Sequence, residues 1–119
     1  MAPSPEDLAA VEARLRAILV PYEERLEWAT IYGIPTLRRP GAKAHDWFAF
    51  VKPASQHVGF YLLPMHTWPD LAESLSPGLR KRLTGKSTFT FKVLDEAEMV
   101  ELDEVVAQAY ERYVAAGPG

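Results

Sequence analysis

The sequence of 119 residues contains no cysteine, and this absence excludes several kinds of chemistry at once. Disulfide bonds, thiolate zinc sites and cysteine nucleophiles cannot form, so any metal site has to use His, Asp or Glu side chains. Long apolar runs are also missing, since no stretch approaches the roughly 20 residues that span a bilayer. Residues 1–7 lack the basic and apolar regions of a signal peptide. We therefore expect a cytoplasmic protein that does not insert into a membrane.

Motifs that would identify an enzyme are missing as well. Residues 83–88 resemble the end of a phosphate-binding loop, but such a loop needs a glycine five residues before Gly85, where this chain has Arg80. Ser55 and His57 are close in sequence, yet no Gly-x-Ser-x-Gly motif or orienting carboxylate accompanies them. We expect a protein without catalytic activity.

Charge is distributed unevenly along the chain, although the net charge is only -3. Residues 1–37 carry three basic residues against six acids, residues 38–92 nine against three, and residues 93–119 one against seven. A basic middle segment can form an anion-binding face, or the acidic ends can neutralise it in the folded protein. We favour neutralisation. We also expect little binding to nucleic acid, because the net charge of the chain is negative.

Helices are predicted at both ends of the chain. Ser4 suits an N-cap and Pro5 the first helical position, and apolar residues then recur every three or four positions up to Leu19. Between the ends, leucines at four-residue intervals predict one or two short helices within residues 68–83. Residues 96–115 form a second long amphipathic pattern, whose apolar stripe consists of Met99, Leu102, Val105, Val106, Ala109, Tyr110 and Tyr113.

The segment after Pro21 is ambiguous. Residues 22–32 have a mixed apolar pattern that fits either a second helix or a strand. We favour a helix that ends at Gly33 as its C-cap, with Pro35 just beyond it.

Strands are predicted in the middle of the chain, where aromatic and β-branched residues concentrate. Residues 46–52 and 56–63 form a hairpin, residues 36–39 pair at the free edge of its first strand, and residues 87–93 add a further strand. In that last strand, side-chain alternation predicts three residues that face the core, namely Phe89, Phe91 and Val93.

Neither face of the first hairpin strand is polar. Strict alternation places Phe48 and Phe50 on one face, and it places Trp47, Ala49 and Val51 on the other. This pattern predicts a central strand that is buried on both sides.

Together these patterns predict a single α+β domain over residues 1–119. We expect a mainly antiparallel sheet of about four to five strands, covered by the N- and C-terminal helices. A chain of this length can bury about two thirds of its unfolded surface without disulfides or a structural metal.

Several short motifs give the chain a family resemblance. They are Tyr32-Gly33-Ile34-Pro35-Thr36, Trp47-Phe48-Ala49-Phe50 leading to Lys52, His57-Val58-Gly59-Phe60-Tyr61, and Gly85-Lys86 before Thr88-Phe89-Thr90-Phe91. In the order and spacing of these motifs the chain resembles the YdhG-like family of small bacterial proteins, a domain of unknown function. The resemblance implies a fold similar to frataxin-type and YjbR-type domains. It also raises an alternative function, because one relative is regarded as a frataxin-like iron chaperone.

The same motifs mark one candidate ligand-binding surface. A Gly-Pro turn lies beside aromatic strands, and a lysine and a histidine add polar groups, although the same residues also suit an ordinary core. The residues expected at this surface are Tyr32, Gly33, Pro35, Trp47, Lys52, His57 and Tyr61. We interpret the protein as a non-catalytic binding or carrier module for a small ligand or a protein partner, acting as a monomer or homodimer without a resident cofactor.

A basic cluster gives a weaker candidate site. Arg80, Lys81, Arg82 and Lys86 are close in sequence and could hold a phosphate or carboxylate group. A solvated turn is the simpler interpretation of this cluster, and we favour it.

Metal binding is the remaining candidate. Frataxin-like proteins bind iron through acidic surface, which points by resemblance to Glu101 and Glu104 on the last helix, although a solvated helix face is the simpler interpretation. His45, His57 and His66 do not have the spacing of a dedicated metal site.

Overall fold

The computed structural model describes residues 4–31, 33–38 and 47–116 of the chain. In chain order the elements are α1 (Pro5–Leu19), the 3-10 turn η1 (Val20–Tyr22), β1 (Glu27–Ile31), β2 (Ile34–Arg38), β3 (Trp47–Pro53), β4 (Val58–Leu62), α2 (Pro64–Thr67), α3 (Asp70–Glu73), α4 (Pro77–Arg80), β5 (Thr88–Phe91) and α5 (Glu96–Ala115). The predicted α+β class, with an antiparallel sheet and helices at both ends, is confirmed. No helix among the described residues is long and apolar enough to cross a membrane.

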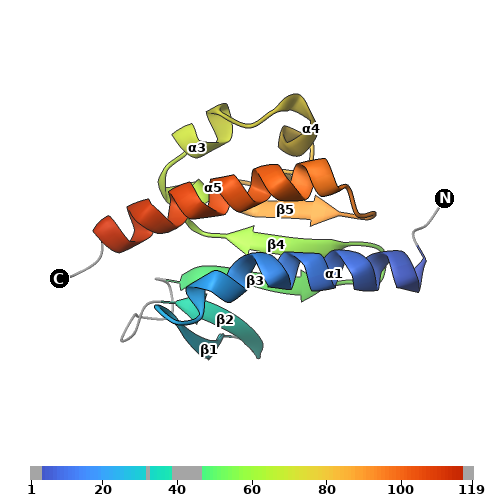
Figure 1. Ribbon diagram of the computed structural model, residues 1–119, viewed down its shortest axis with the longest axis horizontal. Helices are drawn as coiled ribbons and strands as arrows, with labels where there is room; N and C mark the ends of the chain where they lie inside the picture. Colours follow the sequence, from blue (N-terminus) through green and yellow to red (C-terminus); the bar gives the residue numbers. More distant parts are fainter. Residues whose placement is uncertain (1–3, 32, 39–46, 117–119) are drawn as a thin grey trace.

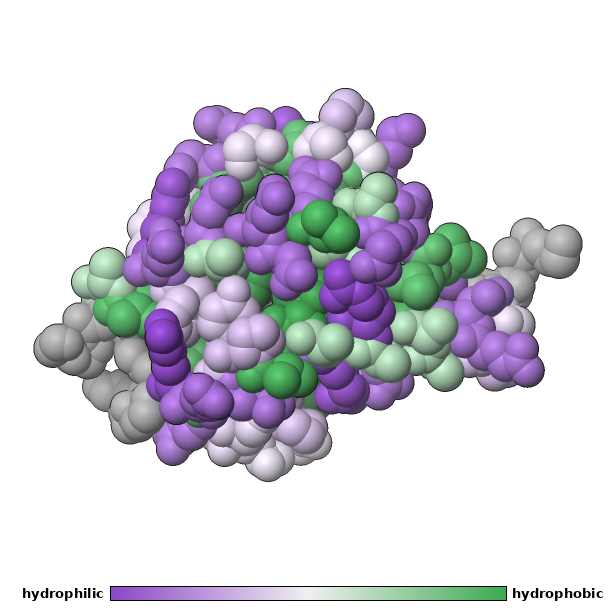
Figure 2. Space-filling view, viewed as in Figure 1, coloured by the Kyte–Doolittle hydropathy of each residue, from purple (hydrophilic) through white to green (hydrophobic). Residues whose placement is uncertain are grey.

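The sheet is a simple meander. Its five strands lie in the order β1-β2-β3-β4-β5, and each pairs antiparallel with its chain neighbour. Helices α1 and α5 lie side by side over one face of this sheet (Figure 1). The outer surface of this layer carries small groups of apolar residues separated by hydrophilic ones (Figure 2). The core therefore lies between the two long helices and one sheet face.

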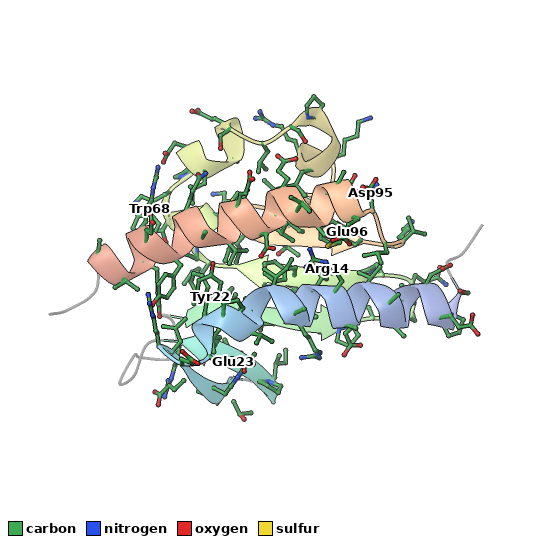
Figure 3. The ribbon with its side chains drawn as sticks, in the orientation of Figure 1. Arg14, Tyr22, Glu23, Trp68, Asp95 and Glu96 are labelled. Atoms are coloured by element: carbon green, nitrogen blue, oxygen red, sulfur yellow. The ribbon has the colours of Figure 1, made fainter. Side chains whose placement is uncertain are left out.

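The first helix begins where the sequence predicts. Ser4 Oγ accepts a hydrogen bond from the Asp7 N–H at 3.1 Å, and the Asp7 carboxylate accepts one from the Ser4 N–H at 3.2 Å. This reciprocal pair satisfies two N–H groups that a helix start leaves without partners. Further along, Arg14 reaches across to Glu96 at the start of α5, with 2.9 Å between Nη2 and Oε1 (Figure 3). The two helices are thus linked by charge as well as by the core.

The helix favoured for residues 22–32 is wrong, because β1 occupies its second half. Trp28 pairs with Leu37 and Ile31 with Ile34, so only two residues connect β1 to β2. Gly33 in this connection has a φ of 78°, a left-handed conformation that tight hairpin turns require and that glycine adopts without strain. The glycine is therefore a hairpin residue and not a helix C-cap.

One extra residue in β3 changes which side chains face the core. Leu37 of β2 pairs with Ala49, but the next residue, Arg38, pairs with Trp47, so Phe48 is a bulged residue with no partner in β2. A bulge of this kind shifts the alternation of side chains by one position. Phe48 and Ala49 consequently both face the helices, and both are fully buried.

The prediction that Phe48 and Phe50 share a face is therefore wrong. The Phe48 ring packs against rings from η1 and α5, with centroid distances of 5.8 Å to Tyr22 and 5.3 Å to Tyr113. Phe50 instead contacts Trp47, at a centroid distance of 5.0 Å, on the opposite face. That opposite face is covered by neither of the two long helices.

The strand pairing extends this division, between a face covered by the long helices and an open face, to the other strands of the sheet. On the helix side, cross-strand partners are buried throughout, and these residues are Leu37, Ala49, Val51, Val58, Phe60, Leu62, Phe89 and Phe91. On the other side the aligned residues are half-buried or exposed in β3 and β5. Val93, which was expected to continue the inward row, lies beyond the end of β5 and is 50% exposed.

We predict that the two phenylalanines of β3 differ in their contribution to stability. Phe48→Ala removes a fully buried ring and should cost about 3 to 5 kcal/mol of unfolding free energy. Phe50→Ala removes a half-buried ring and should cost roughly 1 to 2 kcal/mol. Urea denaturation of both variants measures the difference. Equal losses, or a larger loss for Phe50→Ala, would show that the bulge is absent in solution.

Candidate functional site

Three aromatic rings form a continuous row on the sheet face opposite the helices. Phe50 and Tyr61 are direct cross-strand partners, and their rings stack at 4.4 Å with only 9° between the ring planes. Trp47 extends the row from the other side of Phe50. We call Trp47, Phe50 and Tyr61 the open-face aromatics. All three are half-buried, so part of each ring is available for contact.

A glycine allows this arrangement. A Cβ atom added to Gly59 would lie 2.9 Å from Cε1 of Tyr61, closer than real Cβ contacts allow. The Tyr61 ring therefore leans along its own strand and covers the backbone of Gly59. Because Gly59 pairs with Lys52 on β3, this position also brings the ring next to Lys52.

Polar groups border the open-face aromatics. Lys52 is exposed, and Thr88, the β5 partner of Tyr61, is half-buried. Arg38 lies opposite Trp47 in the register, with its Nε 3.4 Å from Oε1 of Glu27. That Nε forms no hydrogen bond among the described residues, so its link to Glu27 is electrostatic. A small apolar surface with basic groups at its border results.

The structure brings together only some of the residues expected at the ligand-binding surface. Trp47, Lys52 and Tyr61 share the open face, whereas Pro35 lies on the other face of β2, the face of Leu37. Gly33 is in the hairpin connection. His57 precedes β4, and its carbonyl accepts a hydrogen bond from the Ala54 N–H at 2.8 Å. Tyr32 lies outside the described residues.

Sequence reasoning missed Phe50 as a member of this surface. Strict alternation paired it with Phe48, and only the bulge separates them. Residues 47–51 are all apolar, so this run has no polar face. Periodicity alone therefore cannot assign its side chains to one face or the other, and the run itself was the only warning.

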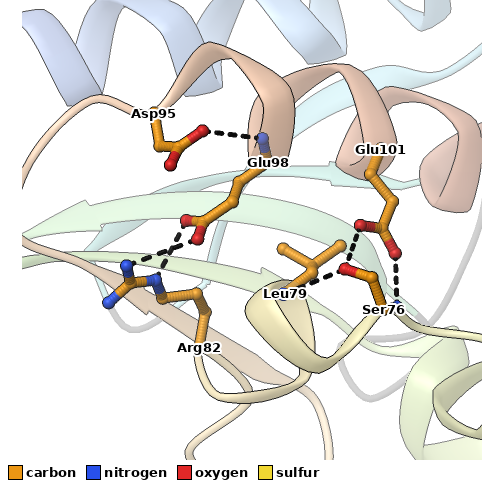
Figure 4. A network of polar contacts seen from close by, with 6 residues as sticks. All are labelled: Ser76, Leu79, Arg82, Asp95, Glu98 and Glu101. Carbon is orange, nitrogen blue, oxygen red and sulfur yellow. Dashed lines mark hydrogen bonds and ion pairs between the residues drawn. The ribbon is translucent and has the colours of Figure 1, made fainter.

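The basic cluster is only partly free. Arg82 is held by Glu98, with Nε 2.9 Å from Oε1, and Glu98 is itself the more buried partner (Figure 4). Arg80, Lys81 and Lys86 are exposed. The four residues therefore do not converge as one anion site.

The two candidate iron ligands on α5 differ. Glu101 accepts hydrogen bonds from the Ser76 N–H at 2.8 Å and from the Ser76 hydroxyl at 2.5 Å, which fixes the start of α4 (Figure 4). Glu104 is exposed. Among the described residues, no group of three or more His, Asp or Glu side chains could hold a metal ion. His45 lies outside the described part of the chain.

Comparison of the chain with protein-family models, with curated proteins and with solved structures finds no match in any of the three. The resemblance to the YdhG-like family thus stays a prediction. The candidate site has to be judged by its own geometry.

We predict that Gly59 and Tyr61 are strongly coupled. Gly59→Ala should lower the unfolding free energy by about 1 to 3 kcal/mol, because the new methyl group displaces a ring that Phe50 holds in place. In a Tyr61→Ala background the same change should cost almost nothing, which a double-mutant cycle by urea denaturation measures.

Gly85→Ala is the matched control, since nothing lies within 4 Å of a Cβ there. Its effect should stay within about 0.5 kcal/mol. A cost at Gly59 that is unchanged when Tyr61 is absent would contradict the described ring position.

Proposed function

We propose that the protein is a non-catalytic binding module that holds a planar ligand with an anionic group on the open face of its sheet. The observation that supports this proposal is the bulge at Phe48, which turns Trp47 away from the core and aligns it with Phe50 and Tyr61. A sheet needs only one apolar face to pack against its helices. Three aromatic side chains on the second face suit recognition.

The stacking geometry favours a planar apolar group. Aromatic rings bind other rings edge-to-face or offset, and each such pair adds about 0.5 to 1.5 kcal/mol beyond the burial of area. The rings of Phe50 and Tyr61 already face each other. A ligand would therefore contact their exposed edges and the free part of Trp47, and it would extend the row rather than enter it.

The charge next to the rings favours an anion. Lys52 is exposed, and it forms no ion pair among the described residues. Lys52 is the cross-strand partner of Gly59, and the Tyr61 ring covers the backbone of Gly59. A carboxylate or phosphate on the ligand would find its partner there.

The proposal does not extend to iron, because no observation favours it. Of the two candidate acids, Glu101 is engaged by Ser76, and Glu104 is an exposed residue that belongs to no group able to hold a metal among the described residues. We further propose that the protein acts in the cytoplasm, since a chain without cysteine fits a reducing compartment.

A pair of probes with the same rings and different charge tests the proposal. 2-Naphthoate should bind more tightly than 2-naphthalenemethanol, and it should shift the indole N–H signal of Trp47 in a heteronuclear NMR titration. Trp28 and Trp68 are internal references, because neither belongs to the open-face aromatics. Tyr61→Ala should abolish binding of both probes, and Tyr61→Phe should retain it.

Lysine variants separate a specific contact from general attraction. Lys52→Met should weaken 2-naphthoate binding by about two- to fivefold, to the level of the alcohol, as expected for one exposed ion pair. Lys86→Met, an exposed lysine elsewhere, should leave it unchanged. Equal effects of the two substitutions, or the largest shifts at Trp28 or Trp68, would reject the proposed site.

A further inference from the structure

A second site candidate lies on the other side of the molecule, between η1 and α5. A groove of about 310 Å³ is lined there by Pro21, Tyr22, Arg25, Ala107, Tyr110 and Glu111. Small-molecule sites range from about 300 to 1,000 Å³, so this groove suits a small ligand. It is separate from the open-face aromatics, which lie across the sheet.

The groove exists because of the residues at one side of α5. Ala107, Tyr110 and Glu111 are three and four positions apart and so lie on one helix face. Ala107 leaves a gap on this face because its side chain is short. Opposite it, Pro21 ends α1, and the 3-10 turn places Tyr22 between the end of α1 and α5 (Figure 3).

Two tyrosines, Tyr22 from η1 and Tyr110 from α5, contact each other in the groove lining. Their rings lie 4.8 Å apart at 42°, and each is 5.8 Å from the buried ring of Phe48. Burial raises the pKa of Tyr22, and the nearby Asp103 carboxylate, Tyr110 and Glu111 raise it further. At neutral pH the phenol is therefore protonated, and its hydroxyl can both donate and accept hydrogen bonds.

Opposite charges also line the groove. Arg25 and Glu111 are exposed, and neither forms an ion pair within the part of the chain that the structure describes. An aromatic face attracts an ammonium group, and so does the Glu111 carboxylate. The Arg25 guanidinium is suited to a carboxylate.

We propose that this groove binds a small zwitterion of the α-amino-acid class with an apolar side chain. In this arrangement the ammonium group lies near Glu111 and the tyrosine rings, and the carboxylate pairs with Arg25. The apolar side chain fills the gap above Ala107. Each of these three parts of the ligand meets a complementary lining residue.

Three probes with a common phenyl ring test the charge pattern by NMR titration at millimolar concentration. L-Phenylalanine should bind more tightly than phenethylamine, which lacks the carboxylate, and more tightly than 3-phenylpropionate, which lacks the ammonium group. Shifts should concentrate at Tyr22, Ala107 and Tyr110. Equal affinity for the three probes, or no shift at these residues, would overturn the proposal.

Single substitutions assign each charge. Glu111→Gln should weaken L-phenylalanine and phenethylamine by about two- to fivefold and leave 3-phenylpropionate unchanged. Arg25→Met should weaken L-phenylalanine and 3-phenylpropionate by a similar factor and leave phenethylamine unchanged. The opposite assignment, or no change in either variant, would contradict the proposed orientation.

A substitution that fills the groove tests whether the ligand binds there. Ala107→Leu keeps a strong helix former at an exposed position, so the fold should survive while L-phenylalanine binding is lost. Ala97→Leu, at an exposed position near the start of the same helix, is the matched control and should bind normally. Undiminished binding by Ala107→Leu would show that the ligand lies elsewhere.

Discussion

The structure depends on one inserted residue, the bulged Phe48 of β3. Its ring packs against three tyrosines, Tyr22, Tyr110 and Tyr113, and so joins the sheet to both η1 and α5. The same insertion reverses the facing of Trp47 and places it with Phe50 and Tyr61. Phe48 therefore supports the groove tyrosines Tyr22 and Tyr110 on one side of the sheet, and its bulge organises the open-face aromatics on the other.

The elements with strong local signals could be predicted from the sequence. The cap at Ser4, the long stripe of α5, the β3–β4 hairpin and the inward Phe89 and Phe91 all rest on periodicity or on capping chemistry. The strand β1 could not be predicted, because its pattern fits both periods and its pairing with β2 is decided by the turn at Gly33. The short helix α2 has no period of its own to detect.

The candidate site was predicted less completely than the fold. The short motifs predicted that Trp47, Lys52 and Tyr61 share one surface, and they do lie on the same sheet face, but alternation alone assigned Phe50 to the wrong face. The groove was missed because it depends on a small residue, Ala107, that is ordinary in any helix. Ala107 lines a groove only because η1 lies opposite it in the folded chain.

The uneven charge of the chain has a structural explanation. Acidic residues of α5 and basic residues elsewhere meet as ion pairs, as in Arg82–Glu98 and Arg14–Glu96. In the pair Arg112–Asp70 the basic residue belongs to α5 and the acid to α3. Its hydrogen bond keeps the pKa of the Asp70 carboxyl below its usual range. Of these three pairs, Arg82–Glu98 alone joins a basic residue of the middle segment to an acid of an end segment, as the predicted neutralisation requires.

The facing of residues around the bulge is the central claim, and nuclear Overhauser effects between aromatic rings test it most directly. The structure predicts contacts from the Phe48 ring to Tyr110 and Tyr113, and from the Trp47 indole to the Phe50 ring. Contacts from Phe48 to Tyr61, together with contacts from Trp47 to the core leucines, would contradict it, because regular alternation without a bulge would then hold.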